Sequence, residues 1–335
     1  MLHWKQLVGL PDAELGRVDV ALVNLACAAD LPGAEQIDHA RCVRTLDYWA
    51  ACVREYTEHY LPKFHANPAA YENSEAYYRT ICLITVLQRD LGVRYNPAKI
   101  PEDVPFETAD SFIHGIIQGD GGTCATMPVV YAAVGRRLGY PIRLVSAWGH
   151  LFARWDDPQG ERLNIEATSQ GLNCYPDDYY RTGRYAVPPE LEKAGGFLVS
   201  KAPRTEMAWF LAQRAYRWIE LGRHKAAADS FAWSSVLNPD SKLAQACLKE
   251  TLEKWADKLD ALRPPGFPKF GVHFPPRRYP DTIPDFIERY MIFYEKLEEC
   301  LTDPEAERLW WGPLRQSKGM PPAKMPALIE VRLYQ

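Results

Sequence analysis

Apolar residues recur every three or four positions along the first hundred residues, which is the spacing of one face of a helix. This spacing predicts helices over residues 18–30, 37–60 and 74–91, each followed by turn-forming residues. We therefore expect a helical N-terminal module at residues 1–100.

The pattern changes near the middle of the chain. A strongly helical stretch at residues 125–138 ends at a Leu-Gly-Tyr-Pro stop, and short apolar runs follow at residues 142–147, 151–155 and 162–166. Short apolar runs between turn residues are typical of strands. Residues 101–200 therefore predict a helix followed by strands, an α+β arrangement.

Helical spacing returns after residue 200. Residues 215–239 follow a helix-turn-helix repeat pattern, with Gly222 in the turn and Pro239 at the end, and residues 243–262 form a partial second copy. Because such repeats need neighbours to bury their faces, we expect this copy to pack on the protein's own core. A groove for a protein partner is the alternative interpretation of the repeat-like helices at residues 201–262.

The last part of the chain, residues 263–335, opens with a proline-dense segment at residues 263–284 that is too broken for a helix. We expect this segment to lie extended along the folded body, and a disordered partner-binding tract is the alternative. A last helix is predicted at residues 285–301, and Trp310 and Trp311 are expected to anchor the tail.

Composition narrows the class of protein. The chain has 335 residues and a net charge of -4, which argues against a general nucleic-acid or membrane-surface binder because those need a basic field. No segment is long and apolar enough for a spanning helix, and the first ten residues lack a signal-peptide core. The eight cysteines are scattered without C-x-x-C pairs, which favours free thiols in a reducing cytoplasm.

The histidines other than His150 have no cysteine or carboxylate partner in a recognisable metal-ligand motif, and no glycine-rich phosphate-binding pattern is present. We expect neither a metal nor a cofactor.

Candidate chemistry gathers in the middle of the chain. Cys124 follows a Gly-Gly-Thr turn at the start of the predicted helix, where the helix dipole and unpaired backbone N–H groups are expected to lower the thiol pKa. His150 begins the second predicted strand, and Asn164 and Glu166 lie on the third. A cysteine, a histidine and an acidic or amide residue are the parts of a thiol acyl-transfer triad.

The stretch from Gly-Gly-Thr-Cys to the Asn-Ile-Glu-Ala-Thr run resembles the transglutaminase-like superfamily of papain-type fold, in which a cysteine-bearing helix packs on a small antiparallel sheet. The resemblance implies Cys124 as nucleophile, His150 as base and Glu166, two residues before Thr168, in the position usually held by Asp. Asn164 is the alternative orienting residue. The domain order is similar to that of bacterial transglutaminase-like proteins joined to tetratricopeptide-like helices, although those proteins often lack the cysteine.

Two further residues are candidates for the site. Gln118 lies six residues before Cys124, the spacing of the oxyanion-hole glutamine in papain-like proteases, and its alternative role is that of a helix-end residue before a glycine turn. Trp148, beside His150, is expected to form a wall of the cleft, or else to be a buried strand aromatic.

These residues predict cysteine-dependent acyl transfer on an amide of a protein or peptide substrate. Hydrolysis of a peptide or isopeptide-type bond is the first expectation, and transamidation with a lysine amine is the second. The alternative from another class is a catalytically silent scaffold that binds a protein partner.

Overall fold

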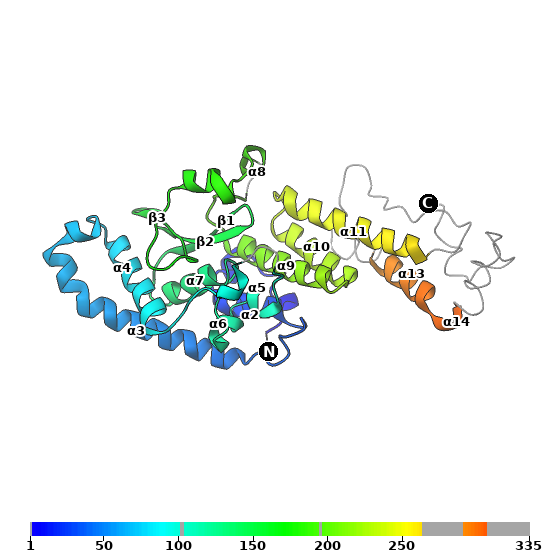
Figure 1. Cartoon of the computed structure of the whole chain (residues 1–335), viewed down its shortest axis with the longest axis horizontal. Coiled ribbons are helices and arrows are strands. Elements are labelled where there is room, and N and C mark those ends of the chain that lie inside the picture. The colour runs from blue at the N-terminus through cyan, green and yellow to red at the C-terminus, as the bar shows by residue number, and fades with distance from the viewer. Residues whose placement is uncertain (1, 101–103, 194–195, 263–290, 307–335) are drawn as a thin grey trace.

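The computed structural model of the chain describes residues 2–100, 104–193, 196–262 and 291–306 (Figure 1). The predicted proline-dense segment at residues 263–284, the Trp310-Trp311 pair and the start of the last predicted helix lie outside the described residues. Within the described part no helix is long and apolar enough to cross a membrane.

The N-terminal part is helical, as its apolar spacing predicts. Its long helices are α2 (Val20–Ala28), α3 (His39–Ala66) and α4 (Glu75–Ile84), and α4 continues into the π-helical turn η3 (Thr85–Asp90). Helix α3 runs past the predicted end at residue 60 because Pro62 is accommodated inside its last turns. Short elements complete this part: η1 (Trp4–Gln6), α1 (Asp12–Leu15), η2 (Pro68–Tyr71), η4 (Pro97–Lys99), α5 (Thr108–Ser111) and α6 (His114–Gln118).

A small antiparallel sheet with the strand order β1-β2-β3 follows helix α7 (Met127–Arg137). The strands are β1 (Ile142–Ala147), β2 (His150–Asp156) and β3 (Arg162–Ile165), close to the predicted apolar runs. Ala147 pairs with His150, so a two-residue turn joins β1 to β2, and its glycine, Gly149, has a φ of 64° that favours glycine. This turn places His150 at the very start of β2.

Helix α7 packs directly on β1 and β2 (Figure 1). A Cβ at Gly135 would lie 2.4 Å from Ile142 Cδ1, so the helix approaches the sheet closely only because this residue has no side chain. All residues of α7 from Met127 to Gly135 are buried, because the sheet covers one side of the helix and α2, α3 and α4 cover the others. The chain therefore has the helix-on-sheet core expected from its sequence.

One continuous apolar core joins the N-terminal helices, α7, the sheet and the first half of α9 (Pro203–Glu220). It extends in sequence from Trp4 to Leu237, so no separate core marks the predicted boundary at residue 100. The division into domains stays a prediction.

The helices after the sheet form a second core. Helix α10 (His224–Leu237) packs against α9 and α11 (Lys242–Leu262), and α13 (Ile292–Thr302) packs on α11 and is followed by the short α14 (Pro304–Ala306). Gly222 lies in the α9–α10 turn with a φ of 68°, as the repeat pattern predicts. Because α9 contributes to both cores, it links the helical hairpin firmly to the sheet region.

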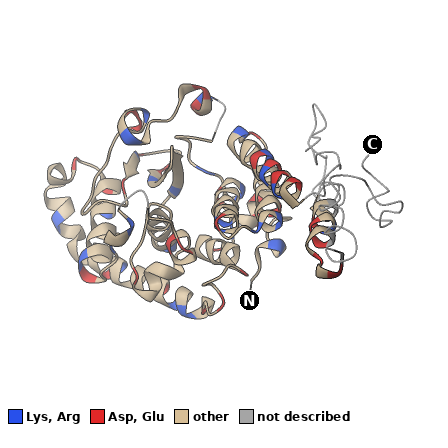
Figure 2. Ribbon diagram, turned by 45° about the vertical axis from the view of Figure 1, so that its right-hand side comes forward, with Lys and Arg blue, Asp and Glu red and all other residues tan. Residues whose placement is uncertain are grey.

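Basic and acidic residues are interspersed along the helices (Figure 2). On α11, Lys249 pairs with Glu253 and Lys254 pairs with Glu250 at the i,i+4 spacing of a solvated helix face.

Candidate active site

Cys124 lies in the turn immediately before helix α7. The turn is ordered by the neighbouring threonines, since Thr123 N donates to Thr126 Oγ1 at 2.9 Å and Thr123 Oγ1 donates to the Asp110 carbonyl at 2.6 Å. A Cβ at Gly122 would lie 2.7 Å from side-chain atoms of Ile116 and Met127, so any larger residue would require these side chains to move. The helix itself begins at Met127, two residues later than the sequence predicts, because the turn residues bond to side chains first.

His150 contacts Glu166 at the end of the sheet. His150 Nε2 lies 2.9 Å from Glu166 Oε2, and the two side chains are only 1% and 5% exposed. Because an ionised carboxylate only accepts hydrogen bonds, Nε2 carries the proton of the imidazole. The other ring nitrogen, Nδ1, is buried and has no hydrogen-bond partner in the part of the chain that the structure describes, so it is available as the acceptor for a thiol.

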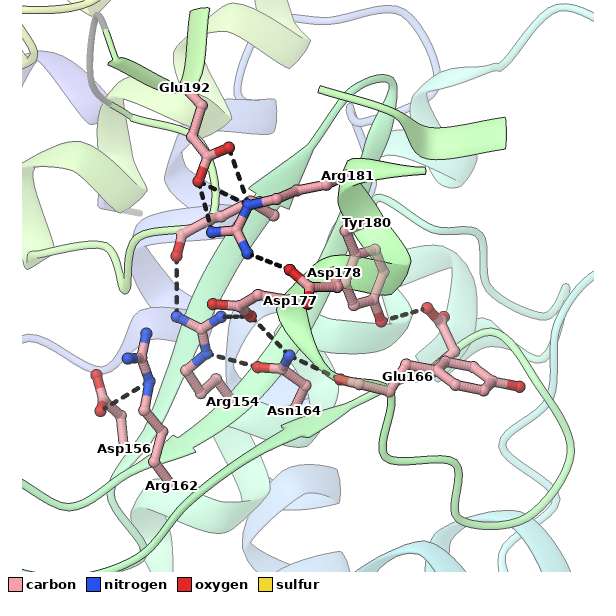
Figure 3. A network of polar contacts seen from close by, with 12 residues as sticks. Arg154, Asp156, Arg162, Asn164, Glu166, Asp177, Asp178, Tyr180, Arg181 and Glu192 are labelled. Atoms are coloured by element: carbon pink, nitrogen blue, oxygen red, sulfur yellow. Dashed lines mark hydrogen bonds and ion pairs between the residues drawn. The ribbon is translucent and has the colours of Figure 1, made fainter. Parts of the chain in front are cut away.

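Glu166 follows β3 directly and is held at both carboxylate oxygens. Oε2 also accepts the Tyr180 hydroxyl at 2.9 Å (Figure 3). Oε1 accepts the backbone N–H and the hydroxyl of Thr168 at 3.0 and 2.6 Å. Burial alone raises the pKa of the Glu166 carboxyl, but the hydrogen bonds and charge of His150, with both hydrogen bonds from Thr168, outweigh burial and hold that pKa below its ordinary value. Glu166 is therefore an ionised partner of the imidazole.

Cys124 and His150 line the same cavity, which has a volume of about 590 Å³. The loop that carries Cys124 is fixed to the chain before it, because Asn96 N donates to the Gly122 carbonyl at 2.7 Å and Gly122 N donates to the Arg94 carbonyl at 2.8 Å. The thiol, the imidazole and the carboxylate thus come from the turn before α7, the start of β2 and the end of β3.

Residues 40–205 match the family model of the Transglutaminase-like superfamily. This transglutaminase-like segment begins in α3, ends early in α9 and contains Cys124, His150 and Glu166. The match indicates cysteine-dependent chemistry on amides in general. No curated protein and no solved structure matches the chain. Most of α9 and all of α10 and α11 lie beyond the segment, so their tetratricopeptide-like character stays a prediction.

The thiol pKa of Cys124 differs from the sequence-based expectation. Burial, and to a smaller extent the charge of Glu166, raise the pKa from 9.0 to about 11, because hydrogen bonding to the backbone and the charge of Arg184 oppose them only in part. The expected lowering by the helix N-terminus is therefore wrong for the substrate-free site, because desolvation of the thiolate outweighs the dipole. A thiol with a raised pKa needs a neighbouring base to become a nucleophile at neutral pH.

Alkylation of Cys124 in the substrate-free protein should accordingly be slower at about pH 6 than that of a free cysteine derivative, and should rise steeply toward about pH 10 as the thiolate forms. Mass spectrometry of iodoacetamide-treated protein across this pH range measures the rate at Cys124 alone. Fast labelling at acidic pH that His150→Ala abolishes would instead demonstrate a preformed thiolate–imidazolium pair and contradict the raised thiol pKa.

Asn164, the alternative orienting residue, has its side-chain amide engaged elsewhere (Figure 3). Its Oδ1 accepts from Arg154 Nε at 2.6 Å, and its Nδ2 donates to Asp177 Oδ1 and to the Tyr175 carbonyl, both at 2.8 Å. Arg154 is fully buried and ion-paired with Asp177 as well. Asn164 therefore provides a hydrogen-bond acceptor for the buried guanidinium of Arg154. Of the two candidate orienting residues, Asn164 and Glu166, it is Glu166 that contacts His150.

Gln118 and Trp148 have different positions relative to the cavity. Gln118 is the exposed last residue of α6, followed by Gly119 with a φ of 102°, and it does not line the cavity that contains Cys124. This is the position of the alternative interpretation, a helix-end residue before a glycine turn. Trp148 is 43% exposed and lines the cavity, with its ring 6.2 Å from that of Phe197.

Two tyrosines that the sequence analysis did not single out contact His150 and its partner Glu166. The Tyr185 ring stacks on the imidazole of His150 with centroids 4.0 Å apart, and Tyr180 donates to Glu166. They come from η5 (Asp177–Arg181) and η6 (Gly183–Tyr185), which lie after the matched motif. The unusual density of tyrosines between residues 175 and 185 is the signal that points to them. No cluster of three or more His, Cys, Asp and Glu side chains that could hold a metal ion occurs among the residues described.

Proposed function

We propose that the protein transfers the acyl group of an amide through a thioester at Cys124. The observation that supports this proposal best is that Cys124 and His150 line one cavity while an ionised carboxylate, Glu166, holds the far nitrogen of the imidazole.

The proposed reaction uses Cys124 as the nucleophile, His150 as base and then acid, and Glu166 as the partner of the imidazolium. Nδ1 of His150 takes the thiol proton as the sulfur of Cys124 attacks the amide carbonyl, and Glu166 stabilises the imidazolium that forms. The C–N bond then breaks, His150 gives its proton to the leaving amine, and a thioester remains on Cys124. Water or a second amine attacks the thioester and transfers a proton to His150. The C–S bond then breaks, His150 returns this proton to the sulfur, and the acyl group leaves as a carboxylic acid or a new amide.

The oxyanion of this reaction needs hydrogen-bond donors beside the sulfur. Gln118 is exposed at the end of α6 and does not line the cavity of Cys124, so we do not propose it as a donor. Tyr95 lies near Cys124, because the charge of Cys124 acts on the pKa of the Tyr95 hydroxyl, and this hydroxyl donates to the Lys99 carbonyl at 3.4 Å. Burial raises the pKa of Tyr95 to about 12, so the hydroxyl keeps its proton and is a donor at neutral pH.

Hydrolysis of a peptide or isopeptide-type bond is our first choice, and transamidation is the second. Water as the acceptor needs no further binding site beside the thioester, whereas transamidation requires room for an amine-bearing partner. The products distinguish the two reactions. We expect wild-type protein, incubated with peptides from a cell extract and an excess of a labelled primary amine, to generate new carboxyl termini that mass spectrometry detects.

Incorporation of the label in place of new carboxyl termini would establish transamidation. Cys124→Ala serves as the control in both readouts. If this variant behaved like the wild type in both, while each protein recovered the same partners on affinity capture, the scaffold would be the better account.

A further inference from the structure

The cavity beside Cys124 is built from two regions of the chain. Cys124, Trp148 and His150 belong to the transglutaminase-like segment, whereas Trp209 and Ala244 belong to helices α9 and α11. Helices that lie beyond the matched segment therefore complete the cavity beside Cys124 and His150.

The wall of the cavity is rich in aromatic rings. The rings of Trp148 and Phe197 lie tilted to one another on the side of the sheet, and Tyr216 packs edge-on against Phe231, with ring centroids 5.3 Å apart, on the side of the helices. A volume of about 590 Å³ is that of a site for a small ligand or one large side chain with its backbone. Aromatic walls of this kind favour an aromatic or large apolar group.

Lys201 adds one positive charge to this wall. It is 7% exposed, and its Nζ donates to the Gly196 carbonyl at 3.1 Å, which uses one of the three donors of an ammonium group. The nearby carboxylate of Glu206 is already bound by two hydrogen bonds from Arg136. Among the residues that the structure describes, no carboxylate forms an ion pair with Lys201.

A buried cation without an anionic partner is costly, so the site favours a ligand that brings one. Burial lowers the pKa of Lys201 to about 8, against the charge of Glu206, and the amine therefore remains mainly protonated at neutral pH. An anionic group that enters the cavity gains a charge-assisted hydrogen bond from this ammonium group.

We propose that the cavity binds an N-acylated aromatic amino acid with a free carboxylate, its ring against the tryptophans and its carboxylate at Lys201. Such a group is either a small N-acyl amino acid or the C-terminal residue of a peptide. That the acylated nitrogen belongs to the scissile amide at Cys124 rests on the proposed function, whereas binding does not.

Isothermal titration of the full-length protein tests the binding directly. We expect N-acetylphenylalanine to bind at least about tenfold more tightly than N-acetylphenylalanine amide, which lacks the charge, and than N-acetylglycine, which lacks the ring. The bound acid should also protect Cys124 from alkylation, which locates it in this cavity. An acetylated tripeptide ending in phenylalanine separates the two sources: equal affinity indicates a peptide terminus, and much weaker affinity a small N-acyl amino acid.

Separate variants test the part of the cavity that binds the carboxylate and the part that binds the ring. Lys201→Gln retains a donor for the Gly196 carbonyl and should abolish the preference for acid over amide, whereas Lys201→Arg should keep it. Lys249→Gln, on the solvated face of α11, is the matched control and should change nothing. Gln213→Trp fills the cavity from α9 and should weaken N-acetylphenylalanine binding about tenfold without slowing alkylation by the small iodoacetamide.

Equal affinity of the wild type for acid and amide would overturn the proposal, even if a Lys201 variant failed to fold. Binding that survives in Gln213→Trp would also overturn it. Tight, Lys201-dependent binding without cleavage of any amide would support this inference and contradict the proposed function. Cleavage of amides without such binding would support the proposed function and contradict this inference.

Discussion

Replacing Cys124 with alanine should lower kcat for amide cleavage by at least about four orders of magnitude, because no other atom in the site can form the thioester. The fold should be unaffected. Cys124 is only partly buried, and the turn around it is held by backbone N–H groups that donate to the hydroxyls of Thr123 and Thr126 rather than by the thiol. Turnover of a cleavable peptide and thermal melting of the same preparations measure the two quantities.

Cys174→Ala is the matched control, because it removes an exposed thiol that does not line the cavity of Cys124. Its turnover should equal that of the wild type. Retention of more than about a tenth of the wild-type turnover by Cys124→Ala would show that the sulfur is not the nucleophile.

Replacing Glu166 with glutamine should reduce kcat by about 10²- to 10⁴-fold with a smaller change in KM. Glutamine has the same shape, but its amide lacks the negative charge that stabilises the imidazolium of His150. Its NH₂ group also faces hydrogen-bond donors, either the imidazole and Tyr180 or the N–H and hydroxyl of Thr168. In the first orientation the imidazole loses its favoured tautomer as well as its charge partner, and in the second it loses the charge partner alone. Steady-state kinetics, with melting temperature as a check on folding, measures this effect.

Asn164→Ala provides the comparison, because Asn164 was the alternative orienting residue. Its loss leaves the buried Arg154 without one acceptor and should cost about 1–3 kcal/mol of unfolding free energy, with a smaller loss of kcat than Glu166→Gln. If Asn164→Ala were the more damaging change for turnover while both variants melted normally, Glu166 would not be the orienting residue.

Local patterns were sufficient to predict the helices and strands that position the candidate site. The Leu-Gly-Tyr-Pro stop and the short apolar runs after it predicted β1, β2 and β3 closely, because such signals depend on residues that are adjacent in the chain. The order of Cys124, His150 and Glu166 along those elements likewise suggested a triad before any distance was known.

Contacts between distant segments decided the rest. Glu166 rather than Asn164 contacts His150 because Arg154 and Asp177 engage the amide, and the carboxylate of Asp177 comes from a later segment of the chain. Tyr180 and Tyr185 reach the base from beyond the motif, and α9 to α11 close the cavity over it. No short-range pattern encodes these partners.

The thiol pKa illustrates the physical reason. The position of Cys124 before a helix is a local property, and it predicts a lowered pKa. Burial is the sum of contributions from every element that packs around the sulfur, and it raises the pKa instead. Sequence patterns thus specify which groups are present and on which element they lie, whereas desolvation, pairing and cavity shape arise only when remote elements pack together.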